Sequence, residues 1–303
     1  MRIILVGSVG TVKRLRVSLG TLVAIEATAE ATPNAEATIE RAFEAIELIN
    51  RLMHPTAESS DLARINSAPL HEPTRVHASV GQLLNLARRI NALTDGVFDP
   101  CTPAQPGLLS DIEVSGDETQ VVCHAPVALD FGGFAKGYAV DCAIEALMAN
   151  GCTAGLVNAG GDLRVFGQRS EPVFVRGVAG ELINIELTDA ALAVSDATAQ
   201  QRPSEHQGYY VRTRDDHQRA GGTARHGLRG QRKVSTVDAS AVTTPGAQTA
   251  VEYATTYAAV IASRAVVADA LAKCVLLCPP PAAGRALHAF GATQLLPSAV
   301  YRL

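Results

Sequence analysis

A short stretch of the sequence joins an acidic residue, a pair of glycines and a lysine in an order that suits an anionic ligand. It runs Leu129-Asp-Phe-Gly-Gly-Phe-Ala-Lys-Gly-Tyr-Ala-Val-Asp141. The apolar residues up to Leu129 are typical of the end of a buried strand, and a helical pattern begins at Ala135. Between them, Gly132 and Gly133 allow backbone angles that a residue with a Cβ resists. The pattern therefore predicts a strand, a glycine turn and a helix start.

Asp130 and Lys136 lie on either side of this turn and give it its chemistry. The N–H groups at a helix start, with a lysine in the first turn, attract an anion such as a phosphate. The alternative is an ordinary helix start with a capping aspartate and a surface lysine. The stretch is neither a Gly-Lys-Ser/Thr phosphate loop nor a Gly-x-Gly-x-x-Gly dinucleotide fingerprint. The residues alone leave the anion site and the ordinary helix start both open.

The spacing of apolar residues predicts the elements that position this turn. Helices are expected from Thr32-Pro33 to Met53, over Ala78–Leu93, from Ala135 to a stop at Asn150-Gly151, after a cap at Ser263 through Ala268–Lys273, and from Arg285 to a glycine stop at Gly291. Strands are expected at Met1–Gly10, Arg16–Ala27 with Leu19-Gly20-Thr21 at its centre, Gly155–Val157, Leu163–Gly167, Val173–Val175, Ile183–Leu187, Ala190–Val194 and Tyr257–Ala262, with a final strand at the end. Successive short strands favour an antiparallel or mixed sheet over a doubly wound one. The expected fold is α+β, a twisted mixed or antiparallel sheet flanked by helices.

Composition sets the broad class of the protein. The 303 residues are 47% hydrophobic and 18% charged, with a net charge of −4, which gives no general field for nucleic acid. No apolar run is long enough for a membrane-spanning helix. The six cysteines form no Cys-x-x-Cys pair, so buried free thiols in a reducing compartment are expected. The start of the chain is interpreted as a strand rather than a signal peptide, which makes a cytoplasmic location more expected than a periplasmic one.

The chain is expected to form a single domain over residues 1–303. Between about residues 196 and 248 Gly, Gln, Arg, His, Ser and Thr replace apolar residues, and this polar segment is expected to be flexible.

The sequence resembles the ApbE-type flavin transferases (FAD:protein FMN transferases). The stretch that ends at Asp141 matches their D-x-G-G-x-x-K-G-Y-x-x-D run, which touches FAD. Further segments resemble family segments in the family's order: Ser59–Asn66, Gly96–Pro100, Asn158–Asp162 and Ala268–Lys273. The resemblance covers almost the whole chain and implies an ApbE-like fold.

The resemblance also implies which residues meet FAD and a magnesium ion beside its pyrophosphate. The residues implied at the flavin nucleotide are Leu19, Gly20, Thr21, Thr56, Val97, Phe98, Asp99, Asp130, Lys136 and Thr236. The metal would be held by Asp269 and the backbone carbonyl of Gly133, with Lys273 in the place of the family's threonine ligand. No residue emerges as a catalytic base.

Several positions depart from the family. Leu19 replaces a methionine that packs on the flavin, and Thr56 replaces a tyrosine that stacks on it; a hydroxyl offers no aromatic face. Ser235 stands where the family has a histidine. Lys273 cannot ligate Mg²⁺, and it shares a helical face with Asp269 four residues earlier. Either the two form an ordinary ion pair, or Lys273 supplies the positive charge of the missing ion.

The function implied by the resemblance is transfer of FMN from FAD to a Ser or Thr hydroxyl of an acceptor flavoprotein, with release of AMP. The departures keep three alternatives open: a non-catalytic FAD-binding protein, an FAD pyrophosphatase in which water replaces the acceptor, and a relative that shares only the structure.

Overall fold

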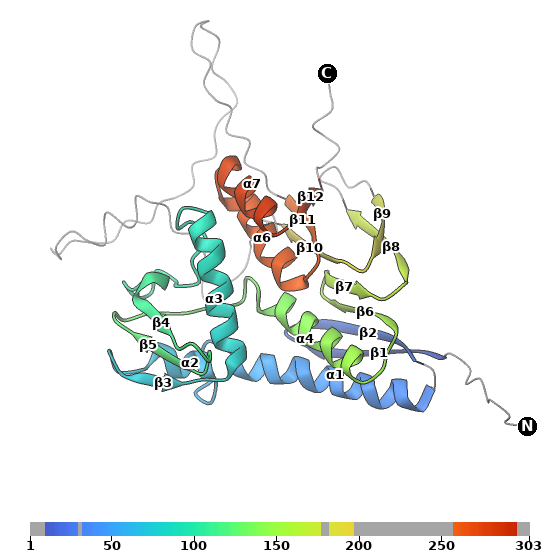
Figure 1. Cartoon of the computed structure of the whole chain (residues 1–303), viewed down its shortest axis with the longest axis horizontal. Helices are drawn as coiled ribbons and strands as arrows, with labels where there is room; N and C mark the ends of the chain where they lie inside the picture. Colours follow the sequence, from blue (N-terminus) through green and yellow to red (C-terminus); the bar gives the residue numbers. More distant parts are fainter. Residues whose placement is uncertain (1–9, 30–31, 177–181, 197–256, 296–303) are drawn as a thin grey trace, which may run out of the picture.

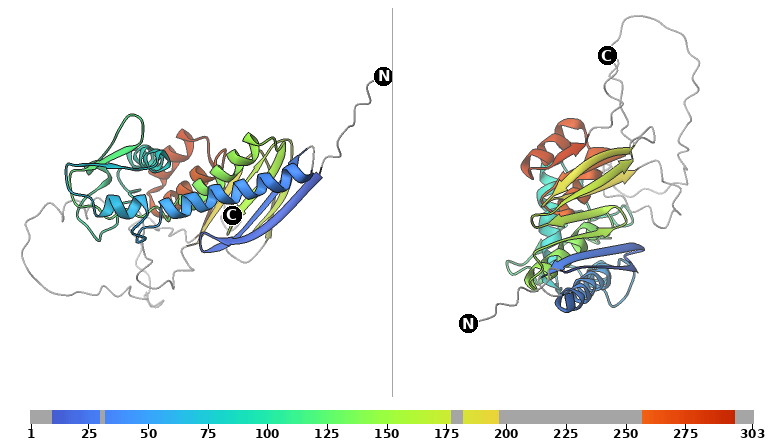
Figure 2. Two further views of the ribbon diagram at one scale, coloured as in Figure 1. Left: turned by 90° about the horizontal axis from the view of Figure 1, so that it is seen from below. Right: turned by 90° about the vertical axis from the view of Figure 1, so that its right-hand side faces the viewer.

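The structure is a computed structural model of the whole chain, and it describes residues 10–29, 32–176, 182–196 and 257–295. In this part of the chain, strands form one large sheet with three helices packed along one of its faces (Figures 1 and 2). The predicted α+β class is confirmed. The polar segment predicted at about 196–248 and the strand predicted at Met1–Gly10 lie outside the described residues, except for Asp196 and Gly10.

The large sheet is antiparallel at every pairing between its strands. Its strand order is β1-β2-β6-β7-β10-β11-β12. The strands are β1 (Gly10–Ser18), β2 (Thr21–Ala29), β6 (Ala154–Ala159), β7 (Asp162–Phe166), β10 (Ala191–Asp196), β11 (Tyr257–Ala262) and β12 (Thr293–Leu295). Alternate residues of β2 face the helices, as the period of two in a strand requires, and Val23, Ile25 and Ala27 are fully buried there.

A two-residue turn interrupts the strand that was predicted over Arg16–Ala27. Leu19 and Gly20 have φ values of 53° and 69°, and they join β1 to β2 in a hairpin that pairs Ser18 with Thr21. Two residues with positive φ match the twist of the flanking strands. The prediction was wrong because the run around this single glycine is otherwise continuous in its β-favouring residues.

Three helices cover the face of the sheet that holds the main core. They are α1 (Thr32–Leu52), α4 (Ala135–Ala149) and α6 (Ala265–Leu277), and α4 packs between the other two. The predicted starts at Thr32 and Ala135 are confirmed, as is the stop of α4 at Asn150-Gly151, where Gly151 has a φ of 85°. Helix α4 is apolar on most sides because it contacts α1, α6 and the sheet. The signature stretch therefore leads into the central helix of the fold.

The remaining elements surround this core. They are the helices α2 (Asp61–Asn66), α3 (Ala78–Leu93) and α7 (Pro280–Ala289), the short 3-10 helix η1 (Leu109–Asp111), the small sheet β3 (Pro73–Arg75), β5 (Gln120–Cys123) and β4 (Ile112–Val114), and the hairpin β8 (Ser170–Arg176) and β9 (Leu182–Thr188). The hairpin packs on the other face of the large sheet, where Val175 and Leu187 join Leu163, Val165 and Leu192 in a second apolar cluster.

None of the helices that the structure describes is both long and apolar enough to cross a membrane. The six cysteines are all free, as expected. Burial raises the pKa of Cys142 to about 12, which leaves its thiol protonated and poorly nucleophilic near neutral pH.

Candidate functional site

Three segments of the chain meet at Leu129, just before the glycine turn; the strand predicted to end there was wrong, because Leu129 forms only an isolated β-bridge. The side chain of Asn66, the last residue of α2, accepts from the Leu129 N–H at 2.7 Å and donates to its carbonyl at 3.0 Å. The Asp130 N–H donates to the Pro100 carbonyl at 3.0 Å, and Cys101 pairs with Leu129 in a β-bridge. These bonds fix the position from which the chain enters the turn and α4.

The segment Gly96–Pro100 contributes buried side chains to this meeting point. Asp99 is 2% exposed, and its carboxylate accepts from the N–H groups of Cys101 at 2.8 Å and Leu109 at 3.2 Å. Phe98 is buried edge-on against Phe134 with ring centroids 5.6 Å apart, while Val97 is half-buried. Asp99 therefore organises its own loop, and its predicted contact with FAD remains a prediction.

The turn itself is built differently from the prediction. Neither Gly132 nor Gly133 has a positive φ, so the turn does not require glycine for left-handed backbone angles. Asp130 is half-buried, and its Oδ1 accepts from the Gly132 N–H at 2.8 Å, which is a local Asx turn. Gly133, between Phe131 and Phe134 in the sequence, is buried. Phe134 is the N-cap residue of α4, and its side chain makes no capping hydrogen bond.

Lys136, in the first turn of α4, forms an ion pair with Asp162 at the start of β7. The lysine side chain is 35% exposed and the carboxylate 2%. Burial and, to a smaller extent, the negative charge of Asp269 raise the pKa of Asp162 to about 6, although Lys136 and Lys273 act in the opposite direction. Asp162, Asp269, Lys136 and Lys273 therefore lie close enough for their charges to interact.

An aspartate at the end of a glycine turn can bind the turn amides, but Asp162 leaves the amide of Gly161 to another side chain. The turn amide of Gly161 is instead bound by the Asn158 side chain at 3.0 Å. The carboxylate of Asp162 is therefore available to Lys136, and the Asn-x-Gly-Gly-Asp segment serves two purposes: Asn158 closes the turn and Asp162 binds the lysine.

Asp269 lies in α6 with no exposed surface. Its Oδ2 accepts from the Gly137 N–H in the first turn of α4 at 3.0 Å, and its Oδ1 is bound by the Lys273 ammonium. Gly137 allows this contact, because a Cβ there would lie 2.4 Å from the Ala265 carbonyl oxygen. The helices α4 and α6 thus approach closely at the site.

Asp141, the last residue of the signature stretch, has a structural function that sequence reasoning missed. It is fully buried, and it accepts from the N–H groups of Ala265 at 2.9 Å and Val266 at 3.0 Å, and from Arg164 at 2.7 Å. It therefore caps α6 from a neighbouring helix. The cap predicted at Ser263 was wrong, since α6 begins at Ala265 with no cap from its own flanking side chains.

Comparison with known proteins identifies the family. The ApbE family matches residues 19–106 and 108–295. The chain belongs to the ApbE family.

Solved ApbE structures share this fold. The apo form of flavinyl transferase ApbE from Pseudomonas stutzeri has a TM-score of 0.65 at 16% identity, and covers 93% of this chain and 88% of its own. Flavin transferase ApbE from Vibrio cholerae has a TM-score of 0.64 at 16% identity, over 95% and 93% of the two chains. The ApbE protein from Thermotoga maritima has a TM-score of 0.62 at 23% identity, over 92% and 87%. Among curated proteins, no sequence matches the chain.

Within this ApbE fold the predicted flavin-lining turn lies beside the cluster formed by Lys136, Lys273 and their partners Asp162 and Asp269. A Cβ on Gly160, which has a φ of 64°, would come within 2.5 Å of the Thr21 Oγ1. The β1–β2 turn with Leu19, Gly20 and Thr21 therefore touches the β6–β7 turn that carries Asp162.

One predicted flavin-binding position in the described part of the chain, Thr56, contacts none of the residues of this cluster. Thr56 is exposed in the loop after α1, where its N–H and Oγ1 lie 3.4 Å and 3.5 Å from the His54 Nδ1. Thr236 lies outside the described residues.

The residues at the family's magnesium position do not fit a magnesium ion in this chain. Mg²⁺ prefers near-octahedral oxygen ligands, but one oxygen of Asp269 is bound to an amide and the other to an ammonium. In the described part of the chain, no group of three or more His, Cys, Asp or Glu side chains could hold a metal ion. We therefore derive no chemistry from a metal here.

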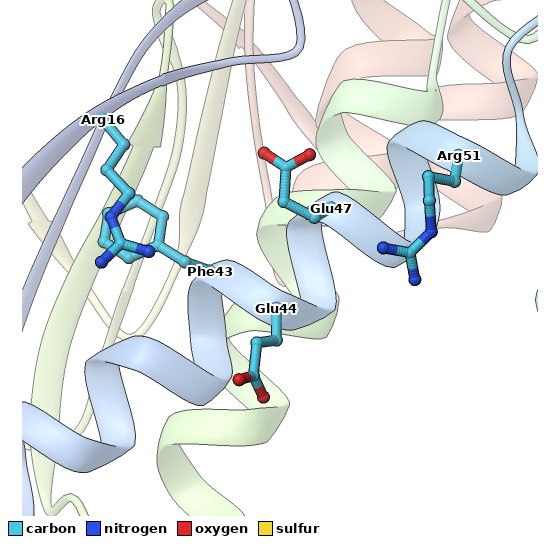
Figure 3. Close-up of a pocket in the computed structure, with 5 residues that line it drawn as sticks. All are labelled: Arg16, Phe43, Glu44, Glu47 and Arg51. Carbon is cyan, nitrogen blue, oxygen red and sulfur yellow. The ribbon is translucent and has the colours of Figure 1, made fainter.

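A pocket of about 480 Å³ lies elsewhere, between α1 and β1, and is lined by Arg16, Phe43, Glu44, Glu47 and Arg51 (Figure 3). The Arg16 guanidinium lies 4.4 Å over the Phe43 ring and is paired with Glu40, and Glu47 accepts from Ser18 at 2.6 Å. These contacts stabilise the packing of the helix on the edge strand, and none of the predicted site residues lines the pocket.

Proposed function

We propose that this chain transfers FMN from FAD to a Ser or Thr hydroxyl of an acceptor flavoprotein. In this reaction the hydroxyl oxygen forms a bond to the FMN phosphorus, and the phosphoanhydride bond to AMP breaks. AMP leaves with the bridging oxygen, and the hydroxyl proton goes to solvent or to a base that we do not assign.

The observation that carries this proposal is the pairing of Lys136 and Lys273 with buried carboxylates beside two tight turns. Phosphoryl transfer depends on positioning the phosphates and on neutralising their charge, more than on a nucleophile from the enzyme. The two ammonium groups, held in place by Asp162 and Asp269, are suited to that task.

The turn at Asp130 supports the same function by fixing the start of α4 relative to these lysines. Asn66 and the Pro100 carbonyl hold the residues before the turn. A diphosphate placed at the start of α4 would meet Lys136 from a rigid scaffold, which is what orientation of a reacting group requires.

Incubating the protein with FAD and an acceptor flavoprotein tests the proposal. Mass spectrometry should show a gain equal to FMN on one Ser or Thr of the acceptor, with one AMP released for each FMN attached. Bound FAD without a gain on the acceptor would indicate a flavin-binding protein, and free FMN with AMP would indicate a pyrophosphatase. Either result would refute the transfer.

Variants at Lys136 connect the reaction to the site. Lys136→Gln should lower the transfer rate at least about ten-fold, because one charge-assisted hydrogen bond to a phosphate is lost. Since this change leaves Asp162 without its cation, the double variant K136Q/D162N, which keeps a neutral pair, should be measured beside it. Lys13→Gln on β1 is the matched control and should leave the rate unchanged. Equal transfer rates in all variants would show that Lys136 does not contribute to the reaction.

A further inference from the structure

The cation position beside Asp269 is already taken by a side chain of this protein. Lys273 lies one helical turn after Asp269, and its ammonium binds the carboxylate oxygen that the Gly137 amide does not use. The carboxylate has no exposed surface, whereas the lysine side chain is 18% exposed. A ligand that reaches this position can therefore contact the lysine side chain but not the acid.

This arrangement differs from an ordinary surface ion pair. Exposed pairs at this spacing are solvated and contribute little. Here the acid is completely buried, it is also bound by an amide of α4, and its charge is felt by Asp162. An ammonium carries three N–H donors, so binding to one carboxylate oxygen leaves capacity for a second anionic group.

We propose that Lys273 replaces a divalent cation in this site, so that the chain binds the diphosphate of FAD without a metal. The inference rests on the proposed function only in naming FAD as the ligand. Lys273 would bridge the buried carboxylate and a diphosphate oxygen, and Lys136 would contribute the second positive charge.

The replacement changes the net charge of the site. Lys136 and Lys273 balance Asp162 and Asp269, so the four side chains sum to zero when all are ionised. With a divalent ion and an uncharged residue at position 273, the same site would carry one net positive charge. The lysine therefore holds a diphosphate with less charge, but removal of metal ions has no effect on it.

The test measures binding of FAD and of ADP, which carries the diphosphate without the flavin, by calorimetry in EDTA and in Mg²⁺. Bound Mn²⁺ is counted in parallel by electron paramagnetic resonance. For each nucleotide, the affinity of the wild-type protein in EDTA should equal its affinity in Mg²⁺ within about two-fold. The protein should bind no Mn²⁺ in the presence of either nucleotide. A requirement for Mg²⁺, or one Mn²⁺ bound per chain, would overturn the inference, as would no binding of either nucleotide.

The variant Lys273→Thr restores an oxygen ligand. Its affinity for ADP in EDTA should fall at least about ten-fold, the loss expected for one charge-assisted hydrogen bond, and Mg²⁺ should restore it. Lys13→Thr on β1 is the matched control and should behave like the wild type. A K273T variant that binds ADP in EDTA as tightly as the wild type would show that the ammonium contributes nothing and would overturn the inference.

These measurements separate the inference from the proposed function. Metal-independent binding of FAD without any FMN transfer would leave the inference intact and refute the transfer. Transfer that occurs only with Mg²⁺ would do the reverse.

Discussion

Replacing Gly137 by alanine tests the close approach of α4 and α6 on which the site depends. A Cβ at this position would lie 2.4 Å from the Ala265 carbonyl oxygen, 2.7 Å from its carbonyl carbon and 2.8 Å from the Asp269 Cβ. Two of these atoms are backbone, and the third is the first side-chain atom of a helical residue. None can move aside alone, so the helices must separate.

The size of the effect follows from the geometry. Favourable contacts between carbon atoms begin at roughly 3.5 Å, so the helices must separate by up to about 1 Å. Overpacking of this kind costs about 1–3 kcal/mol, and glycine to alanine in a helix returns about 1 kcal/mol. These two effects leave a net loss of about 0–2 kcal/mol, and weakening of the bond from the Gly137 N–H to Asp269 adds about 0.5–1.5 kcal/mol, so we expect Gly137→Ala to lose roughly 1–3 kcal/mol.

The matched control is Gly284→Ala in α7, where a Cβ would meet no atom within 4 Å. This variant should gain up to about 1 kcal/mol, because only helix propensity changes. Urea and thermal unfolding of both variants measure the difference. A Gly137→Ala variant as stable as the wild type, or equal shifts in the two variants, would refute the close packing of the helices.

Two further variants test the buried polar contacts. Asn66→Ala leaves both backbone groups of Leu129 without this partner and should lower the free energy of unfolding by about 1–3 kcal/mol, whereas exposed Asn184→Ala should change it little; equal effects would contradict the reasoning. In the folded state the pKa of Asp162 is about 6, above the ~3.9 of an unfolded aspartate. The protonated side chain therefore stabilises the folded state fully below pH ~4, and this stabilisation is lost as the pH rises through about 6. In the wild type the free energy of unfolding should therefore fall by ~2–3 kcal/mol between pH ~4 and pH ~6, and Asp162→Asn should abolish this fall. The exposed control Asp189→Asn should still show it. An Asp162→Asn variant with the same pH profile as the wild type would contradict the raised pKa.

The sequence was most informative where a pattern is local and repeated. The apolar periodicity of α3 predicted its bounds, Ala78–Leu93, and the same reasoning located α4. A local pattern suffices there because apolar residues at three- and four-residue spacing mark a helix whatever it packs against. The small sheet was not predicted, because β3, at Pro73–Arg75, is too short to show an alternation.

Long-range contacts explain most of what sequence reasoning missed at the site. Asp141 and the amide of Ala265 are far apart in the chain, as are Gly137 and Asp269, so no local pattern links them. The turn at Leu19 was missed for another reason: a leucine with a φ of 53° is uncommon, and the tripeptide lacks the asparagine or aspartate that usually marks such a hairpin.

The two buried acids Asp141 and Asp269 bind helices α4 and α6 to each other in a reciprocal way. Asp141 of α4 accepts from the first amides of α6, and Asp269 of α6 accepts from Gly137 in the first turn of α4. Each carboxylate thus lies at the positive end of the other helix, where a negative charge is favoured.

This arrangement determines what happens when Lys273 is removed. Breaking a buried ion pair costs about 3–5 kcal/mol when the remaining charge has no other partner. Asp269 keeps the Gly137 amide and the positive end of α4 as partners, so the loss in Lys273→Thr should be smaller than that. The variant that restores an oxygen ligand should therefore fold. Any change in its affinity for a diphosphate then reports on the missing ammonium rather than on a disordered site.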